Sequence, residues 1–209
     1  MTDRQGTDKF PNLAPQSHLR LLFQRPVDHV QESPSTADVA DRSLLILACG
    51  NDLRQDDGAG LALARQIAAA NPHPDLIVDL ICVHQLMPEL ALEVARPEVA
   101  AVLFVDTRVA IGSGQGGQAE NPGADLTLTA LDQTVSTGRL GHHLNAQMVL
   151  LYARELYAKE VPAWLITVPG YAFDHGEGFS PQVQALLAGA DGFIAQVYAQ
   201  ISPANKSGN

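Results

Sequence analysis

The stretch Ser43–Cys49 reads SLLILAC and is an unbroken apolar run of strand length. It shows no alternation of apolar and polar residues, which is typical of a strand buried on both faces of a parallel sheet. Two similar runs follow it, at Leu76–Val83 (LIVDLICV) and at Val99–Val105 (VAAVLFV). These three segments predict the centre of a mainly parallel β-sheet.

Segments with helical spacing and two further strands continue the pattern. Leu126–Leu131 alternates Leu and Thr, which predicts a half-buried strand at the sheet edge, and Ala163–Val168 (AWLITV) predicts another buried strand. Ser180 followed by Pro181 is typical of an N-cap and a first helical position. The predicted helices cover Gly58–Ala70, Pro88–Ala95, Leu144–Ala158 and a final segment from Pro181 to about Gln200.

This alternation of strands and helices predicts a three-layer α/β/α sandwich, in which helices cover both faces of a twisted, mainly parallel sheet of about five strands. We expect residues 42–201 to form this domain. Residues 1–41 are polar and lack a sustained period, so they predict an N-terminal extension, and residues 202–209 predict a C-terminal tail. The Gly-rich stretch Gly112–Asp125 predicts an exposed loop.

Composition excludes several classes of protein. The 209 residues include 13 Lys and Arg and 23 Asp and Glu, a net charge of −10 without a basic cluster, which argues against nucleic acid or an anionic membrane as the partner. No apolar run is long enough to cross a bilayer, and Met1–Phe10 does not resemble a secretory signal. We therefore expect a cytoplasmic protein in which Cys49 and Cys82 are buried, unreactive thiols.

Polar residues gather where the predicted strands end. Asp56 and Asp57 follow the first strand, Asp106 follows the third, and His142 with His143 precedes the long helix. Each has an ordinary explanation, as a helix cap, a turn residue or an exposed histidine pair. However, ligands of parallel sheets bind beyond the carboxyl ends of the strands, where these residues would meet.

The residue types narrow the chemistry of such a site. The chain lacks the G-x-S-x-G, H-E-x-x-H and G-x-x-x-x-G-K-[ST] motifs, and no G-x-G-x-x-G turn follows the first strand. Asp57, Asp106 and His142 would suit a divalent transition metal such as nickel or zinc, with coordination positions left open for a substrate. Alternatively, Asp57 and Asp106 would act as an acid/base pair without a metal.

Several motifs, in order, resemble those of the hydrogenase maturation proteases. Gly50-Asn51 with Asp56-Asp57-Gly58-x-Gly60 is similar to the family's G-N-x-x-x-x-D-[DE]-G-x-G segment. Gln85–Glu89 (QLMPE) resembles its Q-x-x-P-E segment, and Val105-Asp106-Thr107 resembles its V-D-A, with Thr in place of Ala. The later blocks that match in order are Leu140–Leu151, Val161–Pro169 and Gly176–Pro181, so the resemblance extends from about Leu44 to Gln200.

The resemblance implies an endopeptidase that removes the C-terminal extension of a [NiFe]-hydrogenase large-subunit precursor. It implies that Asp57, Asp106 and His142 are both the metal ligands and the catalytic residues, and that the nickel is carried by the precursor. The family often has Glu where this chain has Asp57, so Asp56 is an alternative ligand, as His143 is to His142. Two other hypotheses are a non-proteolytic metal-binding assembly factor on the same fold and a small-molecule hydrolase.

Overall fold

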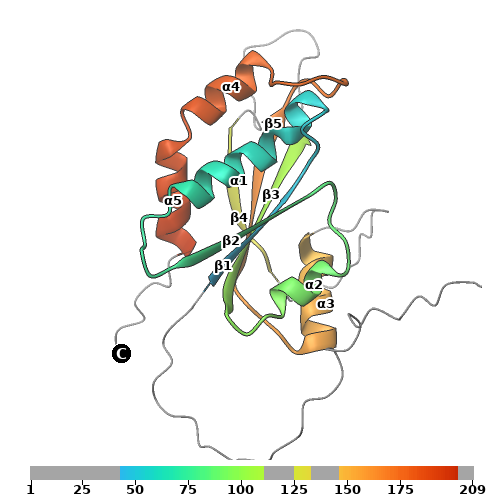
Figure 1. Cartoon of the computed structure of the whole chain (residues 1–209), viewed down its shortest axis with the longest axis vertical. Coiled ribbons are helices and arrows are strands. Elements are labelled where there is room, and N and C mark those ends of the chain that lie inside the picture. The colour runs from blue at the N-terminus through green and yellow to red at the C-terminus, as the bar shows by residue number, and fades with distance from the viewer. Residues whose placement is uncertain (1–42, 111–124, 133–145, 202–209) are drawn as a thin grey trace, which may run out of the picture. The chain divides into compact units, whose positions relative to one another are not determined.

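The computed structural model describes residues 43–110, 125–132 and 146–201. Within them the strands form one five-stranded sheet with the order β2-β1-β3-β5-β4 (Figure 1). β1, β2, β3 and β5 are parallel. β4 lies at the edge of the sheet, as predicted, and pairs with β5 in the antiparallel direction. The strands are β1 (Ser43–Cys49), β2 (Ile77–Val83), β3 (Val99–Val109), β4 (Thr127–Ala130) and β5 (Ala163–Gly170).

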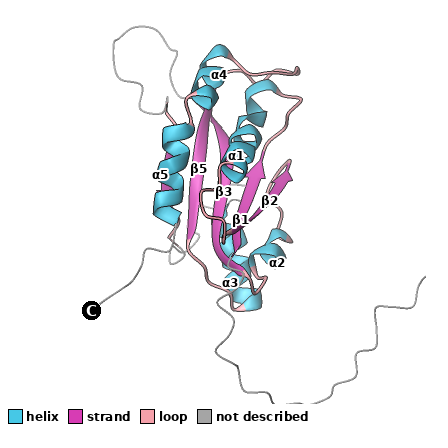
Figure 2. Ribbon diagram, turned by 60° about the vertical axis from the view of Figure 1, so that its left-hand side comes forward, coloured by secondary structure: helices cyan, strands magenta, loops and turns pink. Residues whose placement is uncertain are grey.

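Helices cover both faces of this sheet, which confirms the predicted three-layer α/β/α architecture. Side chains of α1, α4 and α5 share one apolar core with the sheet, and those of α2 and α3 share a second core on the opposite face. In Figures 1 and 2, α2 and α3 accordingly lie together, apart from the other three helices. The helices are η1 (Gln55–Gly58), α1 (Ala59–Ala69), α2 (Leu90–Val94), α3 (Ala146–Tyr157), α4 (Pro181–Ala188) and α5 (Asp191–Ile201).

The central position of β1 explains the composition of the SLLILAC run. All 7 residues of β1 are buried, because β2 and β3 flank it and helices cover both of its faces. Leu44 and Ile46 point into the core beneath α1, whereas Leu45 and Leu47 point into the core beneath α2 and α3. Burying one such side chain contributes about 1.5–3 kcal/mol, so an apolar residue is favoured at every position of the strand.

Two predicted boundaries are wrong for physical reasons. β3 continues past Val105 to Val109, because Asp106–Val109 pair with β5 over Thr167–Gly170, so Asp106 lies within the strand and not after it. The final predicted helix is two helices, since α4 ends where Gly189 caps it and α5 begins at Asp191. Ser180 does cap α4, and its hydroxyl accepts a hydrogen bond from the backbone N–H of Val183 at 3.4 Å.

The prediction for the cysteines is half correct. Cys49 is buried, but Cys82 is exposed, because β2 is an edge strand and has a neighbour on one side only. Among the described residues, no helix has both the length and the apolar composition needed to cross a bilayer. The extension predicted over residues 1–41 and the tail predicted over 202–209 lie outside the described residues, as does the loop predicted over Gly112–Asp125 except for Asp125.

Candidate functional site

The candidate site lies where the connection between β1 and α1 meets the carboxyl ends of β3 and β5. This connection contains η1, which carries Asp56 and Asp57, while Asp106 lies in β3. The start of α1 is in close contact with the strands: a Cβ added to Gly60 would lie 3.3 Å from the carbonyl carbon of Asp106 and 3.3 Å from the carbonyl oxygen of Cys49. The fold therefore brings Asp57 and Asp106 close together at the carboxyl edge of the sheet.

Asp56 is a fully buried carboxylate whose oxygens hold the segment that follows β5. Oδ2 accepts hydrogen bonds from the backbone N–H groups of Tyr171 at 2.8 Å and Ala172 at 3.0 Å. Ser180 donates its N–H to Oδ1 and its hydroxyl to Oδ2, each at 2.7 Å. These four bonds use both oxygens, and the side chain is fully buried, so the carboxylate is closed to a ligand.

These hydrogen bonds also set the ionisation of Asp56. Burial alone would raise the pKa of the Asp56 carboxyl, but the bonds from Ser180, Tyr171 and Ala172 outweigh burial and lower its pKa below the usual value. The residue is therefore an ionised carboxylate that stabilises the fold. Of the two adjacent aspartates, Asp57 is the one whose side chain remains available to a ligand.

Asp57 is half-buried, and its carboxylate makes no hydrogen bond or ion pair with a residue in the described ranges 43–110, 125–132 and 146–201. Its backbone is tightly fixed. The N–H donates to the carbonyl of Arg54 at 3.1 Å, and the carbonyl lies so close to Gly50 that a Cβ there would be 2.1 Å from its oxygen. Gly50 also has a φ of +150°, which L side chains rarely adopt. The close approach and this φ together require glycine at position 50.

Asp106 lies beside Cys49 on one face of the sheet. The register pairs Ala48 with Val105, so Cys49 and Asp106 are level and their side chains share the face that α2 and α3 cover lower down. The N–H of Thr107 donates to Oδ1 of Asp106 at 2.8 Å. Desolvation by the surrounding protein and the nearby charge of Asp57 raise the pKa of the Asp106 carboxyl, and the hydrogen bonds from Cys49 and Thr107 offset this in part.

Cys49 contacts Asp106, which the sequence did not predict, since we expected only a buried thiol in the core. Burial, followed by the charges of Asp106 and Asp57, raises the pKa of Cys49 far above its ordinary value. The sulfur is thus a protonated thiol that can donate to Asp106 and is not a nucleophilic thiolate. The available signal was its position, because Cys49 is the last residue of the central strand.

The structure brings together two of the three predicted ligands. His142 and its alternative His143 lie outside the described residues. Within the described part of the chain, no group of three or more His, Cys, Asp or Glu side chains is arranged to hold a metal ion. What this part does provide is a pair of carboxylates, Asp57 and Asp106, close enough for the charge of Asp57 to contribute to the raised pKa of Asp106. Such a pair favours the binding of a cation.

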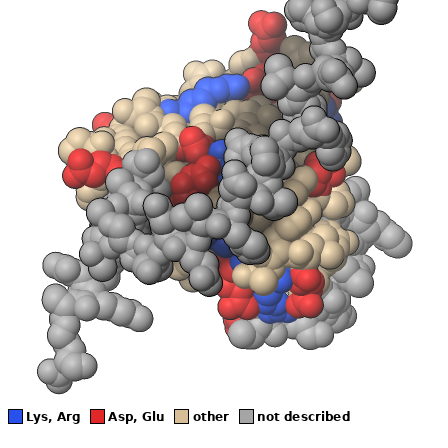
Figure 3. Space-filling model, turned by 60° about the horizontal axis from the view of Figure 1, so that its bottom comes forward, with Lys and Arg blue, Asp and Glu red and all other residues tan. Residues whose placement is uncertain are grey.

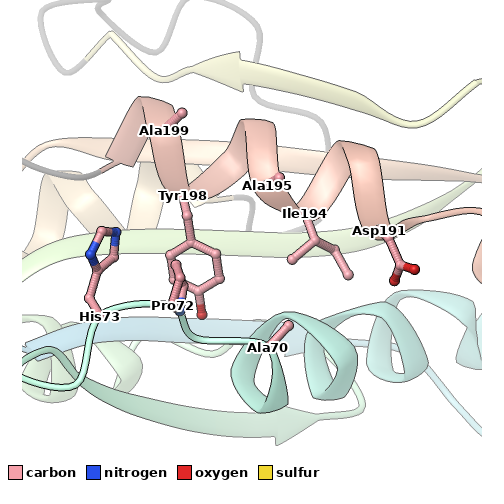
Figure 4. Close-up of a pocket in the computed structure, with 8 residues that line it drawn as sticks. All are labelled: Ala70, Pro72, His73, Asp191, Ile194, Ala195, Tyr198 and Ala199. Atoms are coloured by element: carbon pink, nitrogen blue, oxygen red, sulfur yellow. The ribbon is translucent and has the colours of Figure 1, made fainter.

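A separate cavity lies at the other end of α1, against α5, and has a volume of about 550 Å³ (Figure 4). Its lining consists of Ala70, Pro72, His73, Asp191, Ile194, Ala195, Tyr198 and Ala199. The hydroxyl of Tyr198 donates to the buried carbonyl of Ile67 at 2.7 Å, and burial raises the pKa of this phenol to about 12. This lining is mainly apolar, and it includes neither Asp57 nor Asp106.

Comparison with known proteins identifies the fold. No family model matches the sequence, and no curated protein matches it. Among solved structures, the chain is similar to the [NiFe] hydrogenase maturation protease HycI from Thermococcus kodakarensis KOD1, with 18% identity, a TM-score of 0.53, and coverage of 77% of this chain and 95% of that chain. It is also similar to the hydrogenase maturating endopeptidase HybD from E. coli, with 16% identity, a TM-score of 0.51, and coverage of 76% and 91%.

The chain is thus an α/β/α protein with an acidic pair at the carboxyl edge of its sheet. More particularly, its fold is that of the hydrogenase maturation proteases, as the resemblance of the motifs predicts.

Proposed function

We propose that this protein is an endopeptidase that removes the C-terminal extension of a nickel-loaded [NiFe]-hydrogenase large-subunit precursor. The observation that carries the proposal is the pair formed by Asp57 and Asp106, which lacks a cationic partner among the described residues and lies on a fold shared with two maturation proteases. A pair of carboxylates without a cation destabilises the protein slightly, and a bound cation would remove that repulsion.

In this proposal the nickel belongs to the substrate. Asp57, Asp106 and His142 would bind the nickel that the precursor carries, so that a precursor without nickel would not be held for cleavage. Two carboxylates and one imidazole are a donor set that suits nickel, and three protein ligands leave positions for the precursor's own ligands. The hydrogen bonds that occupy Asp56 support Asp57 as the ligand from η1.

Cleavage adds the oxygen of water to the carbonyl carbon of the peptide bond and delivers a proton to the leaving amine. Asp57 and Asp106 are the described groups at the site that could accept the proton of that water. The raised pKa of Asp106 makes this carboxylate a better base than an ordinary aspartate. The nickel of the substrate would supply polarisation of the carbonyl or of the water.

Incubation of nickel-loaded precursor with the wild-type chain and with Asp57→Ala, Asp106→Ala and His142→Ala tests the proposal. Mass spectrometry of the precursor before and after incubation should show loss of the C-terminal extension with the wild type and little or none with the variants. An intact precursor that binds the wild-type chain would favour the non-proteolytic assembly factor. Full processing by all three variants would exclude the assigned site.

A further inference from the structure

Thr107 connects β3, which carries Asp106, to the segment between β1 and α1, which carries Asp57. It directly follows Asp106 in β3, but because side chains alternate along a strand, it points to the opposite face, toward α1. Its hydroxyl oxygen accepts a hydrogen bond from the backbone N–H of Gly60 at 2.9 Å and lies 3.5 Å from the carbonyl oxygen of Asp57, to which it can donate. One side chain of β3 thus contacts both the start of α1 and the backbone of Asp57.

The side chain of Thr107 is held in this orientation. Its methyl group packs against Gly170 of β5, where an added Cβ would lie 2.9 Å from Cγ2 of Thr107. With the methyl group directed toward β5, the hydroxyl is directed toward α1. The carbonyl of Asp57 therefore has Gly50 against it on one side and the Thr107 hydroxyl on another.

We propose that Thr107 is a positioning residue, whose hydroxyl fixes the backbone of Asp57 relative to Asp106 and so sets the spacing of the two carboxylates. The consequence for cleavage rests on the proposed function above. A purely structural role is the competing explanation, because the N–H of Gly60 belongs to the first turn of α1 and would need an acceptor in any case. The two roles differ in what happens to turnover when the hydroxyl alone is removed.

The test uses Thr107→Ala, Thr107→Val and Thr107→Ser in the full chain. Val keeps the shape but not the hydroxyl, whereas Ser keeps the hydroxyl. Asn71→Ala is the matched control, since it removes side-chain hydrogen bonds to Leu76 and His73 just beyond the other end of α1. Two quantities are measured: the hydrogen-exchange rate of the Gly60 amide, and kcat and KM for cleavage of nickel-loaded precursor.

We expect Ala and Val at position 107 to speed exchange of the Gly60 amide and to lower kcat, each by about tenfold, the effect of losing one hydrogen bond. Thr107→Ser should restore both quantities, and Asn71→Ala should leave kcat unchanged. Unchanged kcat in Thr107→Ala and Thr107→Val, or failure of Ser to restore it, overturns the proposal.

The exchange measurement separates this proposal from the proposed function. If the wild-type chain does not cut the precursor, the proposed function fails. The exchange rate of the Gly60 amide still decides whether the Thr107 hydroxyl holds the start of α1. Faster exchange in Ala and Val, with the wild-type rate in Ser, shows that the hydroxyl holds the start of α1, as the positioning role requires, and unchanged exchange in Ala and Val overturns that role.

Discussion

Acidic side chains at the amino end of the sheet form ion pairs with Arg96, whereas Asp57 and Asp106 at the carboxyl end form none with a described residue. At the amino end, Arg96 lies among three carboxylates: those of Asp79 at 2.5 Å, Glu98 at 3.6 Å and Glu93 at 3.7 Å. Figure 3, which turns the bottom of the view in Figure 1 forward, shows Lys and Arg side chains between acidic ones. At the carboxyl end, Asp57 and Asp106 lie near each other, and neither forms an ion pair with a described residue.

This difference separates charges that pair within the fold from the two charges that we propose bind a cation. The Arg96 pairs are partly exposed, and such pairs stabilise a protein only modestly. The proximity of Asp57 and Asp106 is unfavourable in the absence of a cation. The pair lies at the carboxyl edge of the sheet, where ligands of parallel sheets bind, and this position supports the function that we propose for it.

The largest expected effect is a difference in the free energy of unfolding between variants of Asp56 and of its neighbour Asp57. Asp56→Asn replaces one acceptor oxygen with an NH2 group that faces backbone N–H donors, so we expect a loss of about 3 kcal/mol in the free energy of unfolding. Asp57→Asn should leave that free energy unchanged or raise it slightly, since its carboxylate has no described partner. Chemical denaturation of both variants measures this, and equal destabilisation would contradict the separate roles given to the two residues.

A smaller loss of stability is expected for Gly50→Ala. The added Cβ would lie 2.1 Å from the carbonyl oxygen of Asp57, and the φ of +150° is unfavourable for alanine, so we expect destabilisation by about 2 kcal/mol. The matched control is Gly192→Ala in α5, where an added Cβ meets nothing within 4 Å. If Gly50→Ala unfolds at the same denaturant concentration as the control, the backbone of Asp57 is not held as described.

Neutralising one carboxylate at each end of the sheet should change the free energy of unfolding by smaller amounts and in opposite directions. Asp79→Asn removes a partner of Arg96 and should lower the free energy of unfolding by about 0.5 kcal/mol. Asp106→Asn removes a charge that is desolvated and lies near Asp57, so it should raise that free energy slightly while abolishing cleavage. Thermal unfolding at low salt compares the two, and destabilisation by both substitutions would remove the contrast between the ends.

The smallest effect expected is in how stability depends on pH, because the contributions of Asp56 and Asp106 change with pH in opposite directions. The pKa of Asp56 is lowered by folding, so its contribution to stability is present above the ordinary aspartate pKa of about 4 and is lost as the pH falls below it. The pKa of Asp106 is raised, so its contribution is present below about pH 4 and is lost as the pH rises through the folded pKa.

Denaturation curves at several pH values measure this difference. Relative to wild type, Asp106→Asn should gain stability as the pH rises above that range, because the wild type then carries a charged Asp106 carboxylate that is desolvated and lies near Asp57. A difference in stability between the two proteins that stays constant from acid to neutral pH would contradict the raised pKa assigned to Asp106.

Much of the fold was predictable from the sequence because periodicity and burial are local signals. β1 needs apolar residues toward both cores, and the SLLILAC run shows this directly. The length of β3 was not predictable in this way, since Asp106–Val109 are held in the strand by pairing with β5, which lies more than 50 residues away in the chain. The exposure of Cys82 likewise depends on the strand order, which places β2 at the edge.

The candidate site was predictable as a set of positions but not as a set of contacts. The sequence left Asp56 and Asp57 as alternatives, and the hydrogen bonds from Tyr171, Ala172 and Ser180 to Asp56 distinguish them. Those donors lie more than 100 residues away, so no local pattern reveals them. The choice between His142 and His143 stays a prediction, because both lie outside the described residues.

Cleavage of the large-subunit precursor with and without nickel is the most direct test of the central proposal, that Asp57 and Asp106, which form no ion pair with a described residue, bind a cation carried by the substrate. The wild-type chain should remove the C-terminal extension from the nickel-loaded precursor and leave the nickel-free precursor intact, and Asp106→Asn should leave both intact. Equal cleavage of the two precursors by the wild type, or wild-type cleavage by Asp106→Asn, would contradict the claim.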